Sequence, residues 1–277
     1  MREVLLAAGS SVADTLHRAA STLAATSETP RLDAELLLAH TLGVDRARLV
    51  VDAREELDPS SLARFDALVA RREAAEPVAY ILGRRDFRRI TLSVDSRVLI
   101  PRPETELLVE VGLTLPRGAS VIDVGTGSGA VALALKDERP DLDVWATEVD
   151  PSALAVAREN GSHLGLEVGF VEADLVDSPE LPVRPDAVLA NLPYVAAGAV
   201  LPPDVARYEP AGALFAGPDG LDVIRRLLAG IQDVQLVALE VGFDQAQAVA
   251  DLLAPRTNSI EIVRDLAGYE RVVVGRR

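Results

Sequence analysis

The chain contains no cysteine, which excludes disulfide bonds and thiolate metal sites. Histidine is scarce as well, because His17, His40 and His163 are the only three and lie far apart in the sequence. Aromatic residues make up 4% of the chain, and no apolar run is long enough to cross a membrane. The segment Met1–Ala20 has no basic cluster leading into an apolar stretch, so we expect an amphipathic helix there rather than a signal peptide. We therefore expect a cytoplasmic protein without a metal site or a membrane association.

Positive charge is also scarce in most of the chain. Residues 1–90 hold 13 Arg and 14 Asp or Glu, a net charge of −1, whereas residues 91–277 carry a net charge of −14. Nucleic-acid binding depends on cations that neutralise phosphates, so the acidic C-terminal part is a poor surface for it. One arginine cluster in the near-neutral part fits either a solvated strand or loop, or a patch that docks a partner: Arg84, Arg85, Arg88 and Arg89.

At 277 residues the chain is large enough for two domains, and its pattern changes twice. Residues 1–75 predict a small bundle of four or five helices, because apolar residues recur at helical spacing in Val12–Leu23, Leu32–Leu42 and Leu62–Val69. Residues 76–100 have few helix signals and predict a β-hairpin connector. Residues 101–277 predict a catalytic domain, which a helix over Glu104–Leu115 begins.

Strands and helices alternate in this last domain. Four helices are expected over Ala130–Lys136, Pro151–Leu164, Leu221–Ala229 and Gln245–Leu253. Seven apolar runs predict strands, namely Ser120–Val124, Leu142–Ala146, Glu167–Glu172, Ala187–Ala190, Leu236–Val241, Ile260–Arg264 and Arg271–Val274. Repeated βα units predict an α/β fold, with a mostly parallel sheet covered by helices on both faces. The short link 265–270 predicts an antiparallel pair at the end.

A glycine-rich loop follows the first of these strands, with the sequence Asp123-Val124-Gly125-Thr126-Gly127-Ser128-Gly129. Glycines there let the backbone turn sharply and approach a ligand closely. Glu148 ends the second strand at the carboxyl edge of the sheet, where it can accept hydrogen bonds from the ribose hydroxyls of a nucleoside cofactor. The loop alone also fits a loose dinucleotide fingerprint, so an NAD enzyme is a rival. Two features favour S-adenosylmethionine: Asp123 stands directly before the glycines, and Ala173-Asp174-Leu175 ends the third strand with an acid for the adenine amine.

The tetrapeptide Asn191-Leu192-Pro193-Tyr194 follows the strand Ala187–Ala190. It suits the transfer of a methyl group to a planar NH2, whose nitrogen is a poor nucleophile because its lone pair is delocalised. A side-chain amide oxygen and a backbone carbonyl can accept the two N–H bonds of such a group, and an aromatic ring can pack against it. We predict that Asn191 and Tyr194 are catalytic and that the whole tetrapeptide binds the substrate. The predicted cofactor-binding residues are Gly125, Thr126, Gly127, Ser128, Gly129, Glu148, Asp174, Leu175 and Asn191.

Several motifs resemble one family along nearly the whole chain. They comprise Arg31–Leu38, Tyr80–Gly83, Ile100–Glu106, the glycine loop, the tetrapeptide, Glu209-Pro210 with Gly217–Leu221, Glu240-x-Gly242-x-x-Gln245, Asp265–Gly268 and Arg271–Val273. Together they resemble PrmC/HemK, the N5-glutamine methyltransferases of peptide-chain release factors. The segment Ile100–Glu106 combined with the N-terminal bundle is the most specific part of this resemblance.

The resemblance implies a Rossmann-like class I methyltransferase domain that uses S-adenosylmethionine. The substrate would be the glutamine of the Gly-Gly-Gln motif in class 1 release factors. Nothing in the sequence suggests an obligate oligomer, so we expect a monomer. Asn191 Oδ1 and the Leu192 carbonyl would accept the amide protons, while Pro193 and Tyr194 would shape the slot. The N-terminal bundle would dock the protein substrate, because the catalytic domain is acidic.

Leu192 departs from the family, which has Asn-Pro-Pro-Tyr at this place. Asn-Leu-Pro-Tyr also occurs in ribosomal RNA adenine dimethyltransferases, so an adenine N6-methyltransferase acting on ribosomal RNA or DNA is the alternative. That alternative requires a basic groove and stacking aromatic residues, whereas the catalytic part of this chain is strongly acidic and aromatic residues are scarce. A non-catalytic module that binds S-adenosylmethionine is a third possibility, although it would not need Asn191 and Tyr194.

Overall fold

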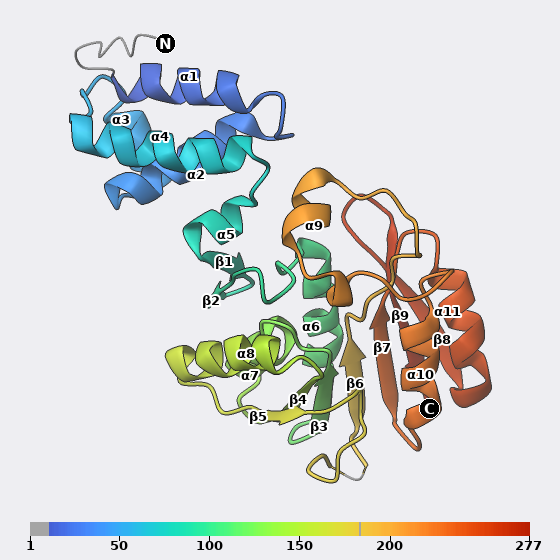
Figure 1. The fold of residues 1–277 in the computed structure, drawn as a ribbon. Helices are drawn as coiled ribbons and strands as arrows, with labels where there is room; N and C mark the ends of the chain where they lie inside the picture. Colours follow the sequence, from blue (N-terminus) through green and yellow to red (C-terminus); the bar gives the residue numbers. More distant parts are fainter. Residues whose placement is uncertain (1–10, 183) are drawn as a thin grey trace. The chain divides into compact units, whose positions relative to one another are not determined.

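The computed structural model describes residues 11–182 and 184–277 of the chain (Figure 1). Their contacts divide the chain into two units. The helical unit comprises Met1–Gly83 together with Pro202–Tyr208, and the catalytic unit comprises Arg84–Leu201 and Glu209–Arg277. The first ten residues of the expected helix over Met1–Ala20 lie outside the described residues. Within the described residues, no helix is long and apolar enough to cross a membrane.

The helical unit contains a bundle in the first eighty residues, as the apolar spacing predicts. Its helices are α1 (Val12–Leu23), α2 (Pro30–Leu42), α3 (Arg46–Val51), α4 (Pro59–Glu73) and α5 (Val78–Leu82). Leu16, Leu37 and Phe65 are buried in its core. The Asp58 side chain caps α4 by accepting hydrogen bonds from the backbone N–H groups of Ser60 and Ser61.

A buried ion pair holds α2 to α4. Arg72 Nε donates to Asp33 Oδ2 at 2.7 Å, and both side chains are 8% exposed. Ser27 Oγ donates to the same oxygen at 2.7 Å, and Thr29 Oγ1 donates to Asp33 Oδ1 at 3.2 Å. The acid in the Arg31–Leu38 motif therefore has a structural role inside the bundle.

One expectation for the connector is wrong in part. The segment from Val78 to Leu82 is the short helix α5, and Gly83 ends it in the left-handed conformation with φ 69°. Its single turn offers too little periodicity for the apolar pattern to indicate a helix. The hairpin is confined to β1 (Arg84–Phe87) and β2 (Ile90–Ser93), which pair antiparallel.

A second short helix belongs to the helical unit although it lies far along the chain. This is α9 (Pro203–Tyr208), whose Tyr208 hydroxyl donates to the Ala74 carbonyl at 3.1 Å. The sequence pattern does not predict α9. Its six residues bury no side chain fully, so they produce no apolar stripe.

The catalytic unit contains a seven-stranded sheet in the order β5-β4-β3-β6-β7-β9-β8. Its strands are β3 (Ser120–Val124), β4 (Asp143–Glu148), β5 (Gly169–Glu172), β6 (Ala187–Ala190), β7 (Leu236–Glu240), β8 (Ser259–Arg264) and β9 (Glu270–Arg276). The first five strands in the sheet order are parallel, and β9 pairs antiparallel with both β7 and β8. The predicted α/β fold is confirmed, including the antiparallel pair at the end.

Helices cover both faces of this sheet (Figure 1). One face bears α6 (Glu106–Leu113), α7 (Ala130–Glu138) and α8 (Pro151–Leu164), and the other bears α10 (Asp222–Gly230) and α11 (Ala246–Leu253). Gly112 of α6 lies so close to Leu189 of β6 that an added Cβ would be 3.2 Å from its Cδ1. The opposite face of β6 packs Val188 against the apolar residues of α10 and α11. The alternation along the strands thus produces two apolar layers.

Two arginines of the cluster, Arg88 and Arg85, hold the hairpin against the rest of the catalytic unit. Arg88 forms ion pairs with Glu138 and with Glu110, the latter at 2.6 Å, and its own side chain is 14% exposed. Its backbone N–H also donates to Glu106 Oε1 at 3.2 Å. Arg85 Nε donates to the Pro101 carbonyl at 3.2 Å. These two arginines therefore stabilise the fold and are not a free docking patch.

Candidate functional site

A cavity of about 340 Å³ lies at the carboxyl edge of the parallel strands. The glycine loop, the ends of β4 and β5, and the start of the tetrapeptide meet there because parallel strands deliver their carboxyl ends to one edge. The cavity is lined by eight of the nine predicted cofactor residues, namely Gly125, Thr126, Gly127, Ser128, Glu148, Asp174, Leu175 and Asn191. Leu192 and Pro193 also line it, whereas Gly129 and Tyr194 do not.

The glycine loop is held open by backbone hydrogen bonds to β4. The N–H groups of Gly125 and Thr126 both donate to the Thr147 carbonyl at 2.9 Å. Gly125 has φ 71° and Gly127 has φ 55°, a region that favours glycine. Nothing lies within 4 Å of a Cβ built on Gly127, so this glycine leaves open space toward the cavity. Gly129, with φ 85°, is the N-cap residue of α7.

Asp123, which precedes the glycines, stabilises this loop through buried hydrogen bonds. It is 2% exposed, and its Oδ2 accepts from Thr126 Oγ1 at 2.6 Å and from the Ala132 N–H at 3.2 Å. Burial raises the pKa of Asp123 to about 6, although its hydrogen bonds oppose the rise. The acid that precedes the glycines therefore links the loop to the first turn of α7.

Glu148 is more heavily bonded than the sequence suggests. Its Oε2 accepts from the Gly127 N–H at 3.0 Å, and its Oε1 accepts from the N–H groups of Val149 and Asp150 at 2.9 and 3.1 Å. A carboxylate has about four acceptor positions, so capacity remains for a ligand hydroxyl. Glu148 thus supports the glycine loop while facing the cavity.

Asp174 and Leu175, which follow the end of β5, also line the cavity. Asp174 Oδ2 accepts from Arg226 Nη2 at 2.5 Å in an exposed ion pair. Leu175 has φ 59°, which is uncommon outside glycine and turns the chain sharply at the cavity wall. The acid predicted to meet an adenine amine is therefore partly engaged by a cation.

Asn191 is positioned by a residue of the segment Ile100–Glu106, which we call the linker. Its Nδ2 donates to Thr105 Oγ1 at 3.0 Å, and both residues line the cavity. Thr105 lies in a 3-10 turn, Pro103–Thr105, where the sequence predicts the first turn of an α-helix. Glu240, the last residue of β7, is 2% exposed, and its Oε2 has no hydrogen-bond partner among the described residues.

Leu192 packs against the glycine loop. It is 4% exposed, and a Cβ on Gly125 would lie 3.0 Å from its Cδ2. The side chain that departs from the family pattern thus fills space beside the loop. Its backbone carbonyl remains independent of that substitution.

The backbone of Tyr194 is clamped by two motifs further along the chain. Gln245 Nε2 donates to the Tyr194 carbonyl at 2.9 Å, and the Gly242 N–H donates to Gln245 Oε1 at 2.9 Å. Gly220 approaches so closely that an added Cβ would lie 2.1 Å from the Tyr194 carbonyl oxygen. Burial raises the pKa of the Tyr194 hydroxyl to about 12, so it is protonated at neutral pH.

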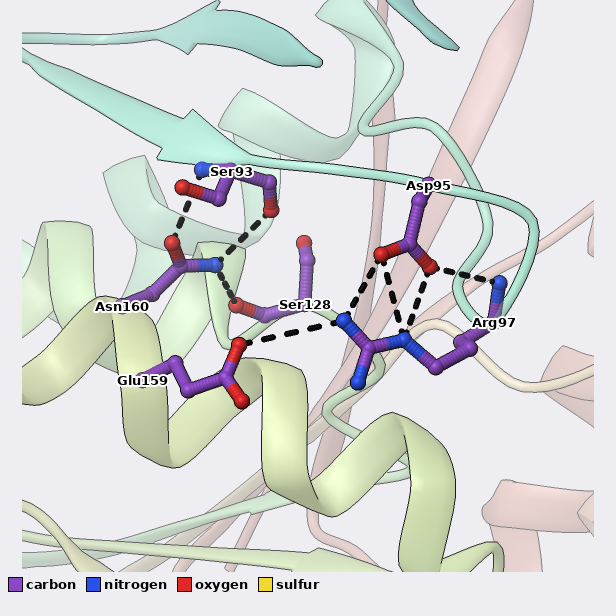
Figure 2. A network of polar contacts seen from close by, with 6 residues as sticks. All are labelled: Ser93, Asp95, Arg97, Ser128, Glu159 and Asn160. Carbon is purple, nitrogen blue, oxygen red and sulfur yellow. Dashed lines mark hydrogen bonds and ion pairs between the residues drawn. The ribbon is translucent and has the colours of Figure 1, made fainter.

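A buried amide joins the hairpin to the glycine loop (Figure 2). Asn160 of α8 accepts from the Ser93 N–H at 2.8 Å and donates to the carbonyls of Ser93 at 3.0 Å and Ser128 at 2.9 Å. Beside it, Arg97 pairs with Asp95 at 2.7 Å and lies 3.8 Å from Glu159. Because Arg97 also lines the cavity, the segment that follows the hairpin forms part of the site.

The linker is anchored by a second buried acid. Glu209 accepts from the Ile100 N–H at 3.2 Å and pairs with Arg102 at 2.5 Å, and its side chain is 2% exposed. Glu209 therefore holds the segment Ile100–Arg102 in place through a hydrogen bond and a salt bridge.

Several site residues lie outside the predicted set. Four of them, Thr105, Asn160, Gln245 and Gly220, contact a predicted residue far away in the sequence, and the fifth, Glu240, contacts Thr105. Thr105, Gly220, Glu240 and Gln245 belong to motifs of the family resemblance, which marks them without giving their roles. Asn160 has no signal in the sequence beyond being a polar residue in an otherwise apolar helix stripe.

Comparison with known proteins identifies relatives for both units. The model of the PrmC N-terminal domain matches residues 14–83, and that of the methyltransferase small domain matches residues 103–207. The release factor glutamine methyltransferase of Mycolicibacterium smegmatis is 47% identical, covering 77% of this chain and 77% of its own. The enzyme of the same name from Burkholderia pseudomallei is 43% identical, covering 88% and 91%.

Solved structures share the fold at low identity. The hMettl16 catalytic domain in complex with MAT2A 3'UTR hairpin 6 has a TM-score of 0.54 at 17% identity, covering 76% of this chain and 81% of that one. A methyltransferase from Pyrococcus furiosus has a TM-score of 0.51 at 16% identity, covering 67% and 87%. These similarities support the Rossmann-like methyltransferase architecture of the catalytic unit.

Proposed function

The chain belongs to the release factor glutamine methyltransferase family, and we propose that it methylates the side-chain amide nitrogen N5 of the glutamine in the Gly-Gly-Gln motif of class 1 peptide-chain release factors. The methyl donor is S-adenosylmethionine. The observation that carries the proposal is one cavity, lined both by the glycine loop with Glu148 and by Asn191 to Pro193. A donor bound by the first set would present its methyl group to an amide bound by the second.

The residues around the cavity fit a nucleoside cofactor. Apolar side chains of Val149, Ala173 and Leu175 offer walls for a base, and the Glu148 carboxylate retains acceptor capacity for ribose hydroxyls. Gly127 leaves the space that a side chain would fill. When bound, S-adenosylmethionine supplies an electrophilic methyl group and leaves as a neutral thioether.

The tetrapeptide has the groups that an amide substrate requires. Asn191 Oδ1 and the Leu192 carbonyl accept the two N–H bonds of the glutamine amide, so that its nitrogen faces the methyl donor. No strong base is required before attack, because the nitrogen becomes acidic as the new N–C bond forms and then releases a proton to solvent. Catalysis therefore consists chiefly of positioning and exclusion of water.

The helical unit is assigned to recognition of the protein substrate. Residues 1–75, the proposed recognition domain, belong to the near-neutral part of the chain, whereas residues 91–277 carry a net charge of −14. An acidic catalytic part disfavours a nucleic-acid substrate. We assign residues 76–100 as connector, residues 101–277 as catalytic domain, and a monomeric, cytoplasmic enzyme.

The test is methyl transfer from labelled S-adenosylmethionine to a purified class 1 release factor. A release factor with glutamate in place of the motif glutamine is the matched control, and ribosomal RNA is the second acceptor. Labelling of the first substrate alone supports the proposal. Labelling of the RNA, or equal labelling of the glutamate variant, would overturn it.

A further inference from the structure

The amide of Asn191 can turn either of its ends toward the cavity. Its oxygen and its NH2 are nearly equal in size, so packing alone does not select between them. Only the orientation with Oδ1 toward the cavity can accept a proton from a substrate amine. Some other group must therefore determine which end faces the substrate.

Thr105 and Glu240 lie beside this amide. Asn191 Nδ2 donates to Thr105 Oγ1 at 3.0 Å, and Thr105 is 4% exposed. Ala190 pairs with Leu239 across β6 and β7, so Asn191 and Glu240 come next on adjacent strands. Thr105 is also the side-chain hydrogen-bond partner of the Glu240 carboxyl group, which is 2% exposed and whose Oε2 has no partner among the described residues.

We propose that Glu240 and Thr105 are positioning residues that hold the Asn191 amide with its oxygen toward the substrate. An ionised carboxylate can only accept a hydrogen bond, so the Thr105 hydroxyl must donate its single proton to Glu240. The hydroxyl can then only accept from Asn191, which must present its NH2. Asn191 Oδ1 is then the end of the amide that is left to accept from the substrate. This inference rests on the proposed function and specifies how its acceptor is oriented.

The two hydrogen bonds, from Asn191 to Thr105 and from Thr105 to Glu240, run in this direction only while Glu240 is ionised. The pKa of Glu240 is raised to about 7, chiefly by burial and also by the charge of Glu104, against the opposing effects of Thr105, Arg271 and Arg102. Tyr194, a further titratable neighbour, remains protonated, because burial and the charge of Glu240 raise the pKa of its hydroxyl to about 12. A protonated Glu240 can donate to Thr105, whose own proton is then free to turn toward Asn191. Activity should therefore rise with pH as Glu240 ionises near neutrality.

The experiment compares Glu240→Gln, Thr105→Val and Thr105→Ser with the wild type. Gln at position 240 can donate to Thr105, so the direction of the two hydrogen bonds is no longer fixed. Val at position 105 removes the hydroxyl. We expect both variants to lower kcat about 10- to 100-fold, with the dissociation constant of S-adenosylmethionine unchanged within about twofold. Thr105→Ser should retain most activity, because it keeps the hydroxyl. The double variant, Glu240→Gln with Thr105→Val, should lose no more kcat than the worse single variant, since both substitutions break the same series of hydrogen bonds.

Two readouts separate positioning from a merely structural role. The rise of kcat near pH 7 should disappear in Glu240→Gln and should move to lower pH in Glu104→Gln, which removes a neighbouring negative charge. The unfolding midpoint of Glu240→Gln above pH 7 should equal or exceed that of the wild type, because Gln carries no buried charge. Wild-type kcat in Glu240→Gln, an unchanged pH profile, or a lowered midpoint with weakened cofactor binding would each overturn the proposal.

Failure of the proposed function would give a different result. If the wild type labels adenine in RNA and no release factor, the assigned substrate falls. The variants would then be measured on that RNA, because a planar adenine NH2 needs the same acceptor. Wild-type kcat in Glu240→Gln on the acceptor that the wild type labels would overturn the positioning role alone.

Discussion

Glu148 binds the backbone of its own loop with the same carboxylate that faces the cavity. We expect Glu148→Ala to raise the dissociation constant of S-adenosylmethionine about 10- to 100-fold, because a hydrogen bond to a charged group is worth about 1.5–3 kcal/mol. Calorimetry measures this affinity. Glu172→Ala is the matched control, since Glu172 pairs with Glu148 in the sheet register but is exposed and does not line the cavity. Equal affinities of the wild type and Glu148→Ala would contradict the assignment.

Asn191 and its neighbour Leu192 contribute to the site by different parts of their structure. Asn191→Ala removes a side-chain acceptor, so we expect methyl transfer to fall about 100-fold or more while cofactor affinity changes little. Leu192→Pro leaves the backbone carbonyl in place and should keep most of the activity. Single-turnover transfer to a release factor checks both. The assignment fails if Asn191→Ala keeps more than a tenth of the wild-type rate, or if Leu192→Pro is the more damaged variant.

The hairpin, α8 and the glycine loop are joined through the single amide of Asn160 (Figure 2). Asn160→Ala leaves one buried and two partly buried backbone groups without this partner, so we expect a loss of about 2–3 kcal/mol in the free energy of unfolding and weaker cofactor binding. Denaturant titration and calorimetry measure the two effects. Glu159→Ala, an exposed neighbour with one ion pair at 3.8 Å, should change neither. A stability loss with unchanged cofactor affinity would show that Asn160 does not support the loop.

Within the helical bundle, α2 and α4 depend on a charge pair rather than on apolar contact alone. Asp33→Ala leaves Arg72 charged and buried, so we expect a loss of about 3 kcal/mol or more in the free energy of unfolding. Arg31→Ala breaks a more exposed ion pair with Glu35 at 2.7 Å, and should cost about 0.5 kcal/mol or less. Urea unfolding followed by circular dichroism compares the two variants. Similar losses in both would contradict a buried structural role for Asp33.

Elements with strong local signals could be predicted from the sequence almost residue by residue. The helix Pro151–Leu164 has both predicted ends, because Asp150 caps its start and Gly165 with φ 66° ends it. The one-turn helices α5 and α9 could not be predicted, since five or six residues carry too little periodicity. The supports of the site could not be predicted either: Asn160 meets Ser93 across 67 residues, and Asn191 meets Thr105 across 86. Local pattern contains no information on such pairs.

Stability of the whole molecule should depend on pH through two buried acids. Burial raises the pKa of Asp123 to about 6 from its ordinary 3.8, and that of Glu240 to about 7 from 4.5. The folded protein therefore retains these protons to higher pH than the unfolded chain, so their contribution to stability declines as pH rises from about 4 to about 7. Urea unfolding across this range should show a shallower decline for Glu240→Gln than for the wild type. Parallel curves for the two proteins would contradict this account.

The polypeptide passes between its two units three times, after Gly83, before Pro202 and after Tyr208. Removing the first eighty-three residues would therefore remove the helices that form a unit with α9. It would also remove the Ala74 carbonyl, to which the Tyr208 hydroxyl donates a hydrogen bond. A chimera made with a relative would have to exchange two separated stretches of the gene together. Recombination at a single crossover point would pair α9 with foreign helices. We expect the helical and catalytic parts of proteins in this family to be inherited together rather than exchanged as independent domains.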